Sequence, residues 1–478
     1  MGRDIPWTEF SQEDFEEFRH RLKQENRILM NWFKQGVFEP DKLLCGFELE
    51  AWLVDSRLRP APINEAFLEA VDSPLVVPEL AKFNFEINST PQRLHPSTFF
   101  CFEEELREVW NRCQAQARRL EAEVLAIGIL PTVTDAMLTL DNMSSVRRYF
   151  ALNQQVMRLR RGRPLKIQIE GRDRLQVEHR DVMLESVATS LQIHLQVDPA
   201  RAPVWYNLSQ SVSAPMVAVA ANSPFLFGKD LWDETRIPVF EQAVSVASFR
   251  HLKGETIGRV TFGTGYCRNS MFEPFLENLD GFPVLLPLVF DDDPSWMSHL
   301  RLHNGTIWRW NRPLIGLGAG GTPHLRIEHR TPAAGPSLPD IIANIAFFVG
   351  LVAGLARQEP DLPARLPFEQ ARENFYAAAK QGLKARIQWL DGRRWEIGPL
   401  ILDRLLPLAR QGLIDAGASP EEVRHYLDGI IGPRVETGQN GAAWQRAFIQ
   451  RHGPCFEEMT RAYARNQSSN LPVHQWEV

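Results

Sequence analysis

The stretch Gly46-Phe47-Glu48-Leu49-Glu50 decides the fold of this chain. It lies within an apolar run over residues 43–54, which predicts a β-strand. Side chains alternate between the two faces of a strand, so the apolar residues share one face and Glu48 and Glu50 share the other. Two neighbouring carboxylates repel each other unless a proton or a cation neutralises them. A hard divalent ion with oxygen ligands would do so, whereas a solvated strand face is the alternative interpretation of this motif alone.

Four further segments alternate between apolar and polar residues in the same way. They are Phe83–Asn88, Leu165–Glu170, Leu191–Asp198 and Leu325–Arg330. A period of two is typical of an antiparallel sheet with one buried face. The polar faces are rich in Glu, Gln, His, Asn and Arg, with a single Lys. We therefore predict an α+β fold in which helices cover the apolar face of one antiparallel sheet. The other face would be a concave surface that handles metal ions and phosphate.

Length and composition are consistent with a soluble enzyme. The chain has 478 residues and a net charge of −6, which allows a large core or two domains and gives no reason to expect nucleic-acid binding. Its five cysteines are scattered, which suggests reduced thiols and a cytoplasmic location. The polar, acidic N-terminus does not resemble a signal peptide. The apolar run over residues 341–355 is too short to span a membrane, so a buried helix is expected and no membrane partner.

Helices are expected between and after the strands. The predicted segments are 10–33, 96–126, 143–161, 203–221 and 235–247, followed from about Pro367 by almost only helix (369–384, 398–412, 420–430, 442–465). The Pro-rich stretch 358–367 is the best candidate boundary. We predict a catalytic sheet domain with covering helices over residues 1–360 and a helical segment, 361–478, packed on it. That segment could be a lid or simple packing, and its polar tail, 466–478, is expected to fray.

Two other motifs allow more than one interpretation. Gly316–Gly321 fits the pattern Gly-x-Gly-x-x-Gly, but a dinucleotide site needs a helix after it and a further strand follows here. A hairpin or an active-site loop is therefore expected. Trp308 and Trp310 flank Arg309 and could either stack on a ligand ring or belong to the core.

Taken together, these segments resemble the glutamate–cysteine ligase superfamily, and within it the bacterial carboxylate–amine ligases that are similar to the plant-type enzymes. The segment Gly46–Glu50 resembles the first metal-binding strand of that superfamily, and Ile327–Arg330 resembles its closing Glu-x-Arg strand. The resemblance also includes Glu79 and Glu86 as a second acidic pair, His194, and Ala221–Phe225 followed by Arg236. It implies a funnel-like antiparallel sheet related to those of glutamine synthetase and the guanidino kinases.

The resemblance implies a chemistry as well as a fold. Such ligases transfer the γ-phosphoryl group of ATP to a carboxylate, and an amine then displaces phosphate to form an amide. The residues implied as Mg²⁺ ligands are Glu48, Glu50, Glu79, Glu86, His194 and Glu328. Arg330 is implied to stabilise the phosphoryl group in flight, although an ion pair with Glu328 is an alternative. Arg236 and Asn222 are implied to bind the substrate, with Arg236 on its carboxylate.

The substrates and the activity remain open at this stage. Glutamate and cysteine, the pair used in glutathione biosynthesis, are the default small-molecule substrates of a ligase of this kind. A phosphotransferase of the guanidino-kinase type is an alternative on the same sheet. A nucleotide- or metal-binding homologue without catalysis is a third possibility, which the complete set of acids and Arg330 argues against. The identity of the amine and the oligomeric state do not follow from the sequence.

Overall fold

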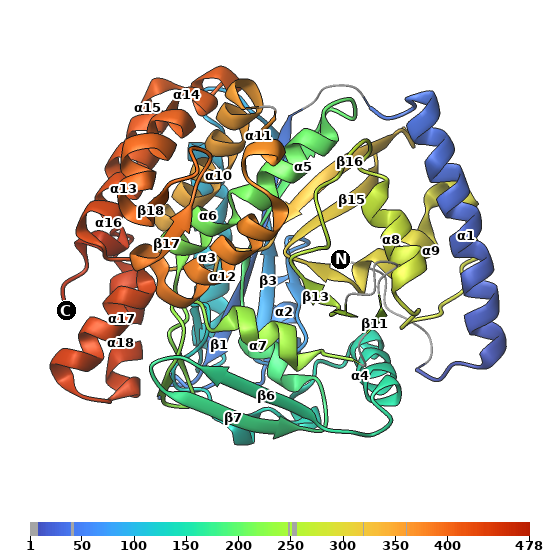
Figure 1. Ribbon diagram of the computed structural model, residues 1–478. Coiled ribbons are helices and arrows are strands. Elements are labelled where there is room, and N and C mark those ends of the chain that lie inside the picture. Colours follow the sequence, from blue (N-terminus) through green and yellow to red (C-terminus); the bar gives the residue numbers. More distant parts are fainter. Residues whose placement is uncertain (1–7, 40–42, 247–248, 251–255, 319, 360) are drawn as a thin grey trace.

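A single curled antiparallel sheet organises the molecule (Figure 1). The computed structural model describes residues 8–39, 43–246, 249–250, 256–318, 320–359 and 361–478. Strands follow the order β15-β16-β8-β1-β3-β2, and β4 and β5 pair with β1 outside this path. Their bounds are β1 Leu44–Val54, β2 Val76–Pro78, β3 Asn84–Asn88, β4 Gln92–Arg93, β5 Glu123–Leu125, β8 Leu191–Val197, β15 Asn311–Leu317 and β16 Pro323–His329. The predicted α+β fold with an antiparallel sheet is confirmed.

One predicted strand does not belong to this sheet. Residues Leu165–Glu170 form β6, which pairs only with β7 (Arg174–His179) in a separate hairpin. Lys166, Gln168 and Glu170 are exposed on this hairpin rather than facing the concave surface. The prediction of one sheet was therefore wrong for this segment. Alternation reports one buried face but does not say which neighbour a strand pairs with.

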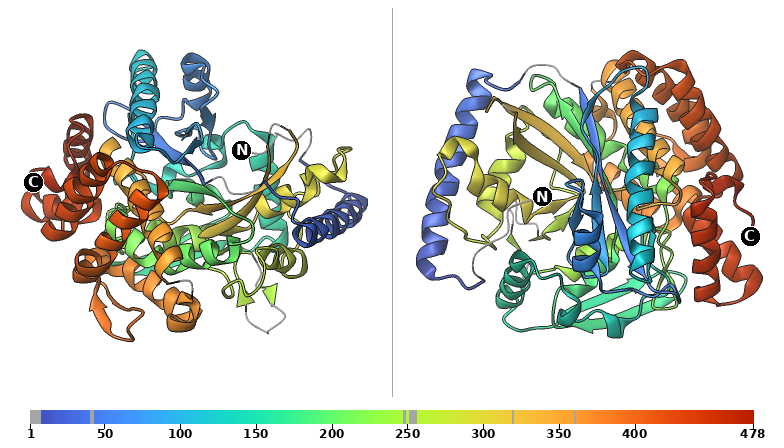
Figure 2. Two further views of the ribbon diagram at one scale, coloured as in Figure 1. Left: turned by 90° about the horizontal axis from the view of Figure 1, so that it is seen from above. Right: turned by 180° about the vertical axis from the view of Figure 1, so that it is seen from behind.

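Helices cover the apolar face of the sheet, as Figure 2 shows from two further directions. They are α3 (Thr98–Arg119), α5 (Ala202–Ser211), α6 (Ser213–Ala220) and α10 (Leu338–Gln358). The ring of Phe102 in α3 meets Phe47 in β1 edge to face, with centroids 5.5 Å apart. Phe348 in α10 stacks on His329 in β16 at 4.1 Å. These contacts place the hydrophobic core between the sheet and this helical layer.

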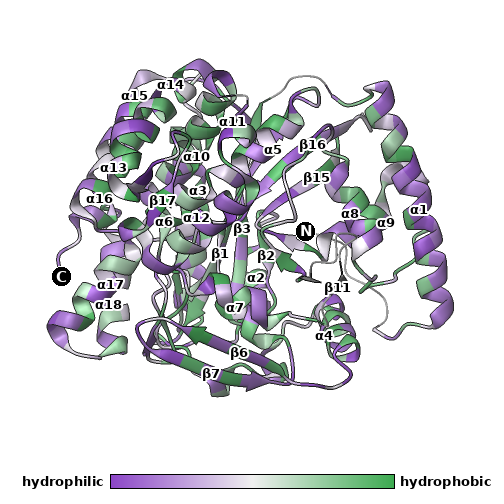
Figure 3. Cartoon of the chain, viewed as in Figure 1, coloured by the Kyte–Doolittle hydropathy of each residue, from purple (hydrophilic) through white to green (hydrophobic). Residues whose placement is uncertain are grey.

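Helix α10 is the centre of that layer. It is largely apolar (Figure 3), and among the described residues it is the one helix that is long and apolar enough to cross a bilayer. Its apolar window is, however, 100% buried inside the molecule. The prediction of a buried core helix is confirmed.

A second group of helices faces the polar side of the sheet. It contains α1 (Gln12–Gln35), α4 (Arg147–Leu159), the 3₁₀ turn η3 (Met183–Val187), α8 (Glu273–Gly281) and α9 (Ser298–Gly305). Glu25 in α1 joins α9 by accepting a hydrogen bond of 2.6 Å from the backbone N–H of Leu300. The concave face is thus enclosed between the sheet and this second group of helices.

The C-terminal segment packs on α10. Its elements are α11 Leu362–Arg365, α12 Phe368–Gln381, η5 Gly382–Lys384, β17 Arg386–Gln388, β18 Arg394–Glu396, α13 Ile397–Leu400, the π-helical turn η6 Ile401–Leu405, α14 Leu406–Ala416, α15 Pro420–Val423, the π-helical turn η7 Arg424–Ile431, α16 Gly432–Thr437, α17 Gly441–His452, α18 Phe456–Ser468 and η8 Val473–Gln475. Arg434 in α16 forms a fully buried ion pair of 2.7 Å with Asp340 in α10. The division at residue 360 stays a prediction, because contacts of this kind tie the segment to the core.

The segment after Pro367 is almost only helix, as predicted, and contains one short hairpin, β17–β18. Two other predictions were wrong. The helix expected over 96–126 ends at Arg119, and its last residues turn into β5. The tail does not fray, since Val473 and Trp476 are buried. The remaining elements are α2 Asn64–Val71, α7 Arg236–Ala243, η1 Asp135–Met137, η2 Leu140–Asn142, η4 Pro294–Trp296, β9 Phe225–Leu226, β10 Lys229–Asp230, β11 Phe249–Arg250, β12 Thr256–Ile257, β13 Val260–Thr261 and β14 Trp308–Arg309.

Candidate functional site

The strand register gathers the acidic residues on the concave face. Glu50 in β1 lies opposite Glu86 in β3, and His194 in β8 lies opposite Glu328 in β16. Glu79 follows the end of β2, the strand that pairs with β3 beside Glu86. Side chains with a period of two share one face, so residues far apart in the sequence meet there.

The first group of potential ligands is Glu48, His194 and Glu328, whose ligand atoms lie within 4.8 Å of one another. His194 Nε2 is 3.2 Å from Glu48 Oε1 and 3.8 Å from Glu328 Oε1. Arg312 grips Glu328 through two hydrogen bonds of 2.7 and 2.8 Å. Burial alone would raise the pKa of Glu328, but Arg312 and Arg330 hold that pKa well below its usual value. Glu328 is therefore an ionised acceptor.

The second group is Glu50, Glu79 and Glu86, again within 4.8 Å of one another. Glu50 accepts hydrogen bonds from the Ser190 N–H at 2.6 Å and from Gln192 Nε2 at 2.8 Å. Glu86 Oε2 has no hydrogen-bond partner within the described part of the chain. Burial raises the pKa of Glu79 to about 8, and repulsion by Glu50 adds to this shift. Burial and the neighbouring carboxylates raise the pKa of Glu86 well above its usual value as well.

Both groups have the chemistry of divalent-cation sites. Carboxylate oxygens with one imidazole nitrogen suit a hard divalent ion, which prefers oxygen ligands. His194 Nδ1 and Glu86 Oε2 are buried without a hydrogen-bond partner in the described structure, and His194 Nε2 lies beside Glu48 and Glu328. Buried polar atoms are normally satisfied, so these open positions fit a bound cation. The residues present therefore fit Mg²⁺.

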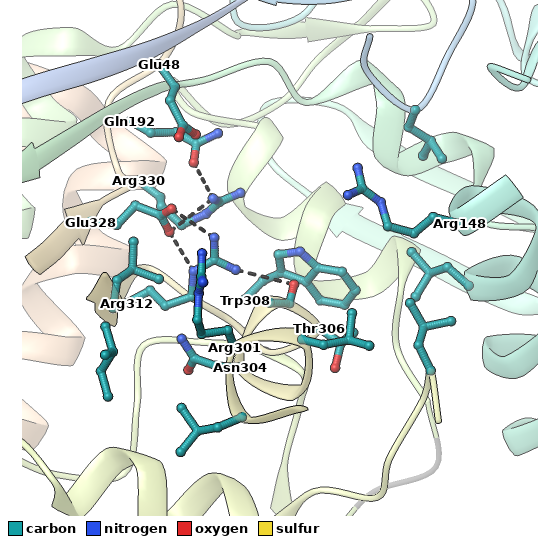
Figure 4. Close-up of a pocket in the computed structure, with 18 of the residues that line it drawn as sticks. Glu48, Arg148, Gln192, Arg301, Asn304, Thr306, Trp308, Arg312, Glu328 and Arg330 are labelled. Carbon is teal, nitrogen blue, oxygen red and sulfur yellow. Dashed lines mark hydrogen bonds and ion pairs between the residues drawn. The ribbon is translucent and has the colours of Figure 1, made fainter. Parts of the chain in front are cut away.

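A cavity of about 590 Å³ lies over these groups. Figure 4 shows Arg301, Arg312 and Arg330 together on one side of it, with Arg148 directed toward them from the opposite side. The part of its wall at α8 and the segment that follows α8 includes the apolar residues Phe275, Leu286, Leu288 and Phe290, and Trp308 of β14 adds to it. Near α4 and η3 the wall is formed by Leu80, Arg148, Tyr149, Leu152, Val182 and Glu185. An anionic ligand with an apolar ring would find matching surfaces here.

Arg330 stands at the centre of the site. It lies 3.2 Å from Glu328 Oε2, and its guanidinium also donates to the side-chain oxygen of Gln192. Its side chain nevertheless lines the cavity. Arg330 thus forms the ion pair with Glu328 and is also accessible to a ligand in the cavity.

The sequence left open whether Trp308 and Trp310 contact a ligand or belong to the core, and the structure gives a different answer for each. Trp308 lines the cavity, so it can contact a ligand. Trp310 is buried and donates a hydrogen bond of 2.9 Å to Glu241. The Gly-rich segment beyond them connects β15 to β16, so the hairpin interpretation is confirmed; Ala319 lies outside the described residues.

Arg236 and Asn222 do not reach the cavity. Arg236 is 1% exposed, pairs with Glu234 at 2.6 Å and donates to the backbone oxygen of Thr331. Asn222 is fully buried and donates to Ala334 O at 2.7 Å and to the Tyr463 hydroxyl at 2.8 Å. Both residues were expected to bind the substrate, but in this arrangement neither side chain is positioned to contact a ligand in the cavity. The backbone contacts of Arg236 fit a residue that positions Arg330 and Thr331 instead.

Sequence reasoning also missed several residues that line the cavity. Gln192 and Arg326 lie on the same polar strand faces as His194 and Glu328. The alternation of polar and apolar residues in these strands could therefore have identified them. Arg148, Glu185 and Arg301 come from α4, η3 and α9. No alternation marks such residues, because helices reach the site only through tertiary packing.

The comparisons with known proteins agree with this fold. The sequence matches glutamate–cysteine ligase family 2 (GCS2) over residues 44–465. Curated protein sequences give no match. The structure is similar to that of a glutamate–cysteine ligase from Francisella tularensis in complex with AMP, with a TM-score of 0.53, 11% identity and 90% of each chain covered.

Two other solved structures are more distant. A bifunctional glutathione synthetase from Pasteurella multocida has a TM-score of 0.44 and 12% identity, with 95% of this chain and 55% of that chain covered. The ligase of the prokaryotic ubiquitin-like protein Pup, in complex with Pup, has a TM-score of 0.36 and 12% identity, with 87% of this chain and 72% of that chain covered. At these identities the likeness concerns the fold.

The family match over residues 44–465 defines the class of the protein as a carboxylate–amine ligase. The chain belongs to glutamate–cysteine ligase family 2.

Proposed function

We propose that this protein is an ATP- and Mg²⁺-dependent ligase that joins a carboxylate to an amine through an acyl phosphate. The observation that supports this most is the juxtaposition of two three-ligand groups with Arg330 in one cavity. Glu48, His194 and Glu328 would hold one Mg²⁺, and Glu50, Glu79 and Glu86 another. When bound, such ions neutralise phosphate charge and orient the phosphoryl group.

The protein residues would act mainly by positioning. Phosphoryl transfer needs alignment and charge stabilisation more than covalent help. A substrate carboxylate oxygen attacks the γ-phosphorus of ATP while the bond to ADP breaks. The amine nitrogen then bonds to the carbonyl carbon, and phosphate leaves with the proton that the amine gives up. Arg330, held by Glu328 and Gln192, would present its fork to the phosphoryl group in the first step.

Glutamate and cysteine are the substrates to test first. Family membership supports a carboxylate–amine ligase, and the finer assignment rests on the family description and on the distant likeness to a glutamate–cysteine ligase. A cavity of about 590 Å³ with one apolar and one charged region is compatible with a nucleotide beside an amino acid.

The direct experiment is a turnover screen. The purified protein is incubated with ATP, Mg²⁺, glutamate and a panel of amino acids and amines, and ADP, phosphate and new amides are read by mass spectrometry. Hydroxylamine is included because it traps an acyl phosphate as a hydroxamate. We expect ADP and hydroxamate to form together only when Mg²⁺ and the carboxylate are present.

Two results would select another function. A phosphorylated guanidine product without release of phosphate would indicate the guanidino-kinase type of phosphotransferase. Absence of nucleotide turnover and hydroxamate with every carboxylate tested would indicate a binding protein without catalysis.

A further inference from the structure

Among the described residues, Glu185 is the one carboxylate in the cavity wall that belongs to neither cation group. The other five, Glu48, Glu50, Glu79, Glu86 and Glu328, all take part in one of them. The Glu185 side chain makes no hydrogen bond or ion pair with any of the residues that the structure describes. It is half-buried, and Leu80, Leu152 and Val182 line the same part of the wall.

The turn that carries Glu185 is fixed by its own hydrogen bonds. Asn153 in α4 accepts from the backbone N–H of Val182 at 3.1 Å, and Asp181 accepts from that of Met183 at 3.0 Å. The Ser186 hydroxyl donates to the Met183 carbonyl at 2.7 Å. The backbone that carries Glu185 at the cavity is therefore held in place by these hydrogen bonds.

A carboxylate in such a place is costly without a partner. Burial raises the pKa of Glu185 to about 8, repulsion by Glu79 and Glu50 adds to the shift, and Arg330 opposes it. A carboxyl group in this position therefore stays largely protonated near neutral pH and ionises when a counter-charge reaches it. A cationic ligand group would supply that counter-charge and form a charge-assisted hydrogen bond.

We propose that Glu185 binds the ammonium group of the acceptor amine. This inference rests on the proposed ligase function and names the acceptor class: amines that reach the site as cations. A third metal ion is not favoured, because the described residues offer no further pair of ligands beside Glu185.

The position of Glu185 favours the acceptor over the donor substrate. The ammonium gives up one proton to the Glu185 carboxylate or to solvent before it attacks, and the second leaves with phosphate. Its nitrogen must then reach the carbonyl carbon that carries the phosphoryl group, so it has to lie near the cation groups and Arg330. Glu185 lines the same cavity as Glu79, Glu50 and Arg330. The α-ammonium of a donor such as glutamate is separated from its γ-carboxyl by three carbons and would lie farther out.

The test compares two acceptors. Cysteine carries an ammonium group, whereas hydroxylamine is largely uncharged at neutral pH and should not need the Glu185 carboxylate for binding. Glu185→Gln and Glu185→Asp are compared with the wild type in two assays with glutamate and ATP. One measures amide formation with cysteine, the other hydroxamate formation. Glu123→Gln, the same change on the exposed end of β5, is the control.

We expect Glu185→Gln to raise the KM for cysteine by roughly ten- to a hundredfold, the scale of one charge-assisted hydrogen bond. Its hydroxamate rate and its KM values for ATP and glutamate should stay close to those of the wild type. The KM of Glu185→Asp for cysteine should lie between those of the wild type and Glu185→Gln. Unchanged hydroxamate formation also shows that the variant is folded.

Three results would overturn the proposal, and they differ from one another. Equal loss in both assays would make Glu185 a structural residue. A raised KM for glutamate in the hydroxamate assay would assign Glu185 to the donor ammonium. No hydroxamate from the wild type with glutamate or any other carboxylate tested would overturn the proposed function itself.

Discussion

At the scale of single residues, Arg330 combines two roles that the sequence left as alternatives. It contacts Glu328 at 3.2 Å, and it faces the cavity. Arg312 satisfies both oxygens of Glu328 from the other side, which leaves part of the Arg330 fork for a ligand. A planar fork with a fixed charge matches a phosphoryl group better than an ammonium does.

We expect Arg330→Lys and Arg330→Ala to lower kcat by ~10³-fold or more, the scale measured for phosphoryl-stabilising arginines. The KM for ATP should change much less. Steady-state kinetics with Arg119→Lys, at the exposed end of α3, as control provide the check. A raised KM with normal kcat would instead assign Arg330 to ground-state binding.

The acidic groups make the stability of the metal-free protein depend on pH. Burial and Glu50 raise the pKa of Glu79 from its usual 4.5 to about 8, and that of Glu86 is raised as well. A group with a raised pKa in the folded state stabilises fully below its unfolded pKa, and this contribution is lost as pH rises through the folded pKa.

We therefore expect the Tm in EDTA to fall between about pH 5 and about pH 8, and Mg²⁺ to raise the Tm more at the upper end of this window. Binding at a hundredfold excess over Kd adds about 2.7 kcal/mol to the free energy of unfolding. The Tm of Glu86→Gln in EDTA should fall less over this pH window, and Mg²⁺ should raise it less. The Tm of Glu123→Gln should change as that of the wild type does. If Mg²⁺ raised the Tm equally at about pH 5 and about pH 8, and equally in the wild type and Glu86→Gln, this assignment of the groups would be refuted.

At the scale of elements, the contact between α10 and α14 depends on glycine. A Cβ added at Gly412 in α14 would lie 2.0 Å from the backbone oxygen of Gly350 and 2.5 Å from the nitrogen of Gly354, both in α10. The two helix backbones thus touch directly, and any side chain at Gly412 would force them apart.

Gly412→Ala is expected to lower the free energy of unfolding by about 1–3 kcal/mol or more, because overpacking a rigid contact forces backbone shifts. Gly281→Ala, at the end of α8 where nothing lies within 4 Å of the added Cβ, is the matched control. Chemical denaturation of the two variants gives the comparison. Equal stability of Gly412→Ala and the wild type would mean that the helices are able to separate at little cost.

At the scale of the whole molecule, the C-terminal tail completes the core behind the sheet. Trp476 is 4% exposed and meets Trp444 and Tyr463 edge to face, at 5.4 and 5.1 Å. The Tyr463 hydroxyl in turn donates to the backbone oxygen of Ala126 at 3.0 Å. The last residues of the chain are thereby joined to a segment that follows β5.

We expect Trp476→Ala to cost about 3 kcal/mol or more, the usual range for a buried aromatic residue in a core. Gln475→Ala, at the exposed neighbouring position, should leave the Tm unchanged. Differential scanning calorimetry of both variants is the measurement. If Trp476→Ala melts as the wild type does, the tail contributes nothing and the fraying predicted from the sequence is correct.

Much of the concave face was predictable from alternation. Because a strand presents every second residue to the same side, the sequence placed Glu48, Glu50, Glu86, His194 and Glu328 on polar faces, and the structure brings them together. Alternation also misled at Leu165–Glu170, which has the same pattern in a separate hairpin. Register and pairing partner are long-range properties, so no local pattern contains them.

The sequence by itself thus determined the type of sheet, its two chemically different faces and the buried helix α10, since these follow from local periodicity and composition. Only the tertiary structure decided the rest. It buried Arg236 against Glu234 and Thr331 away from the cavity, and it brought Arg148, Glu185 and Arg301 into the wall. The physical reason is that a helical side chain acquires its neighbours only when distant segments pack, and the burial that defines such a site exists only in the folded chain.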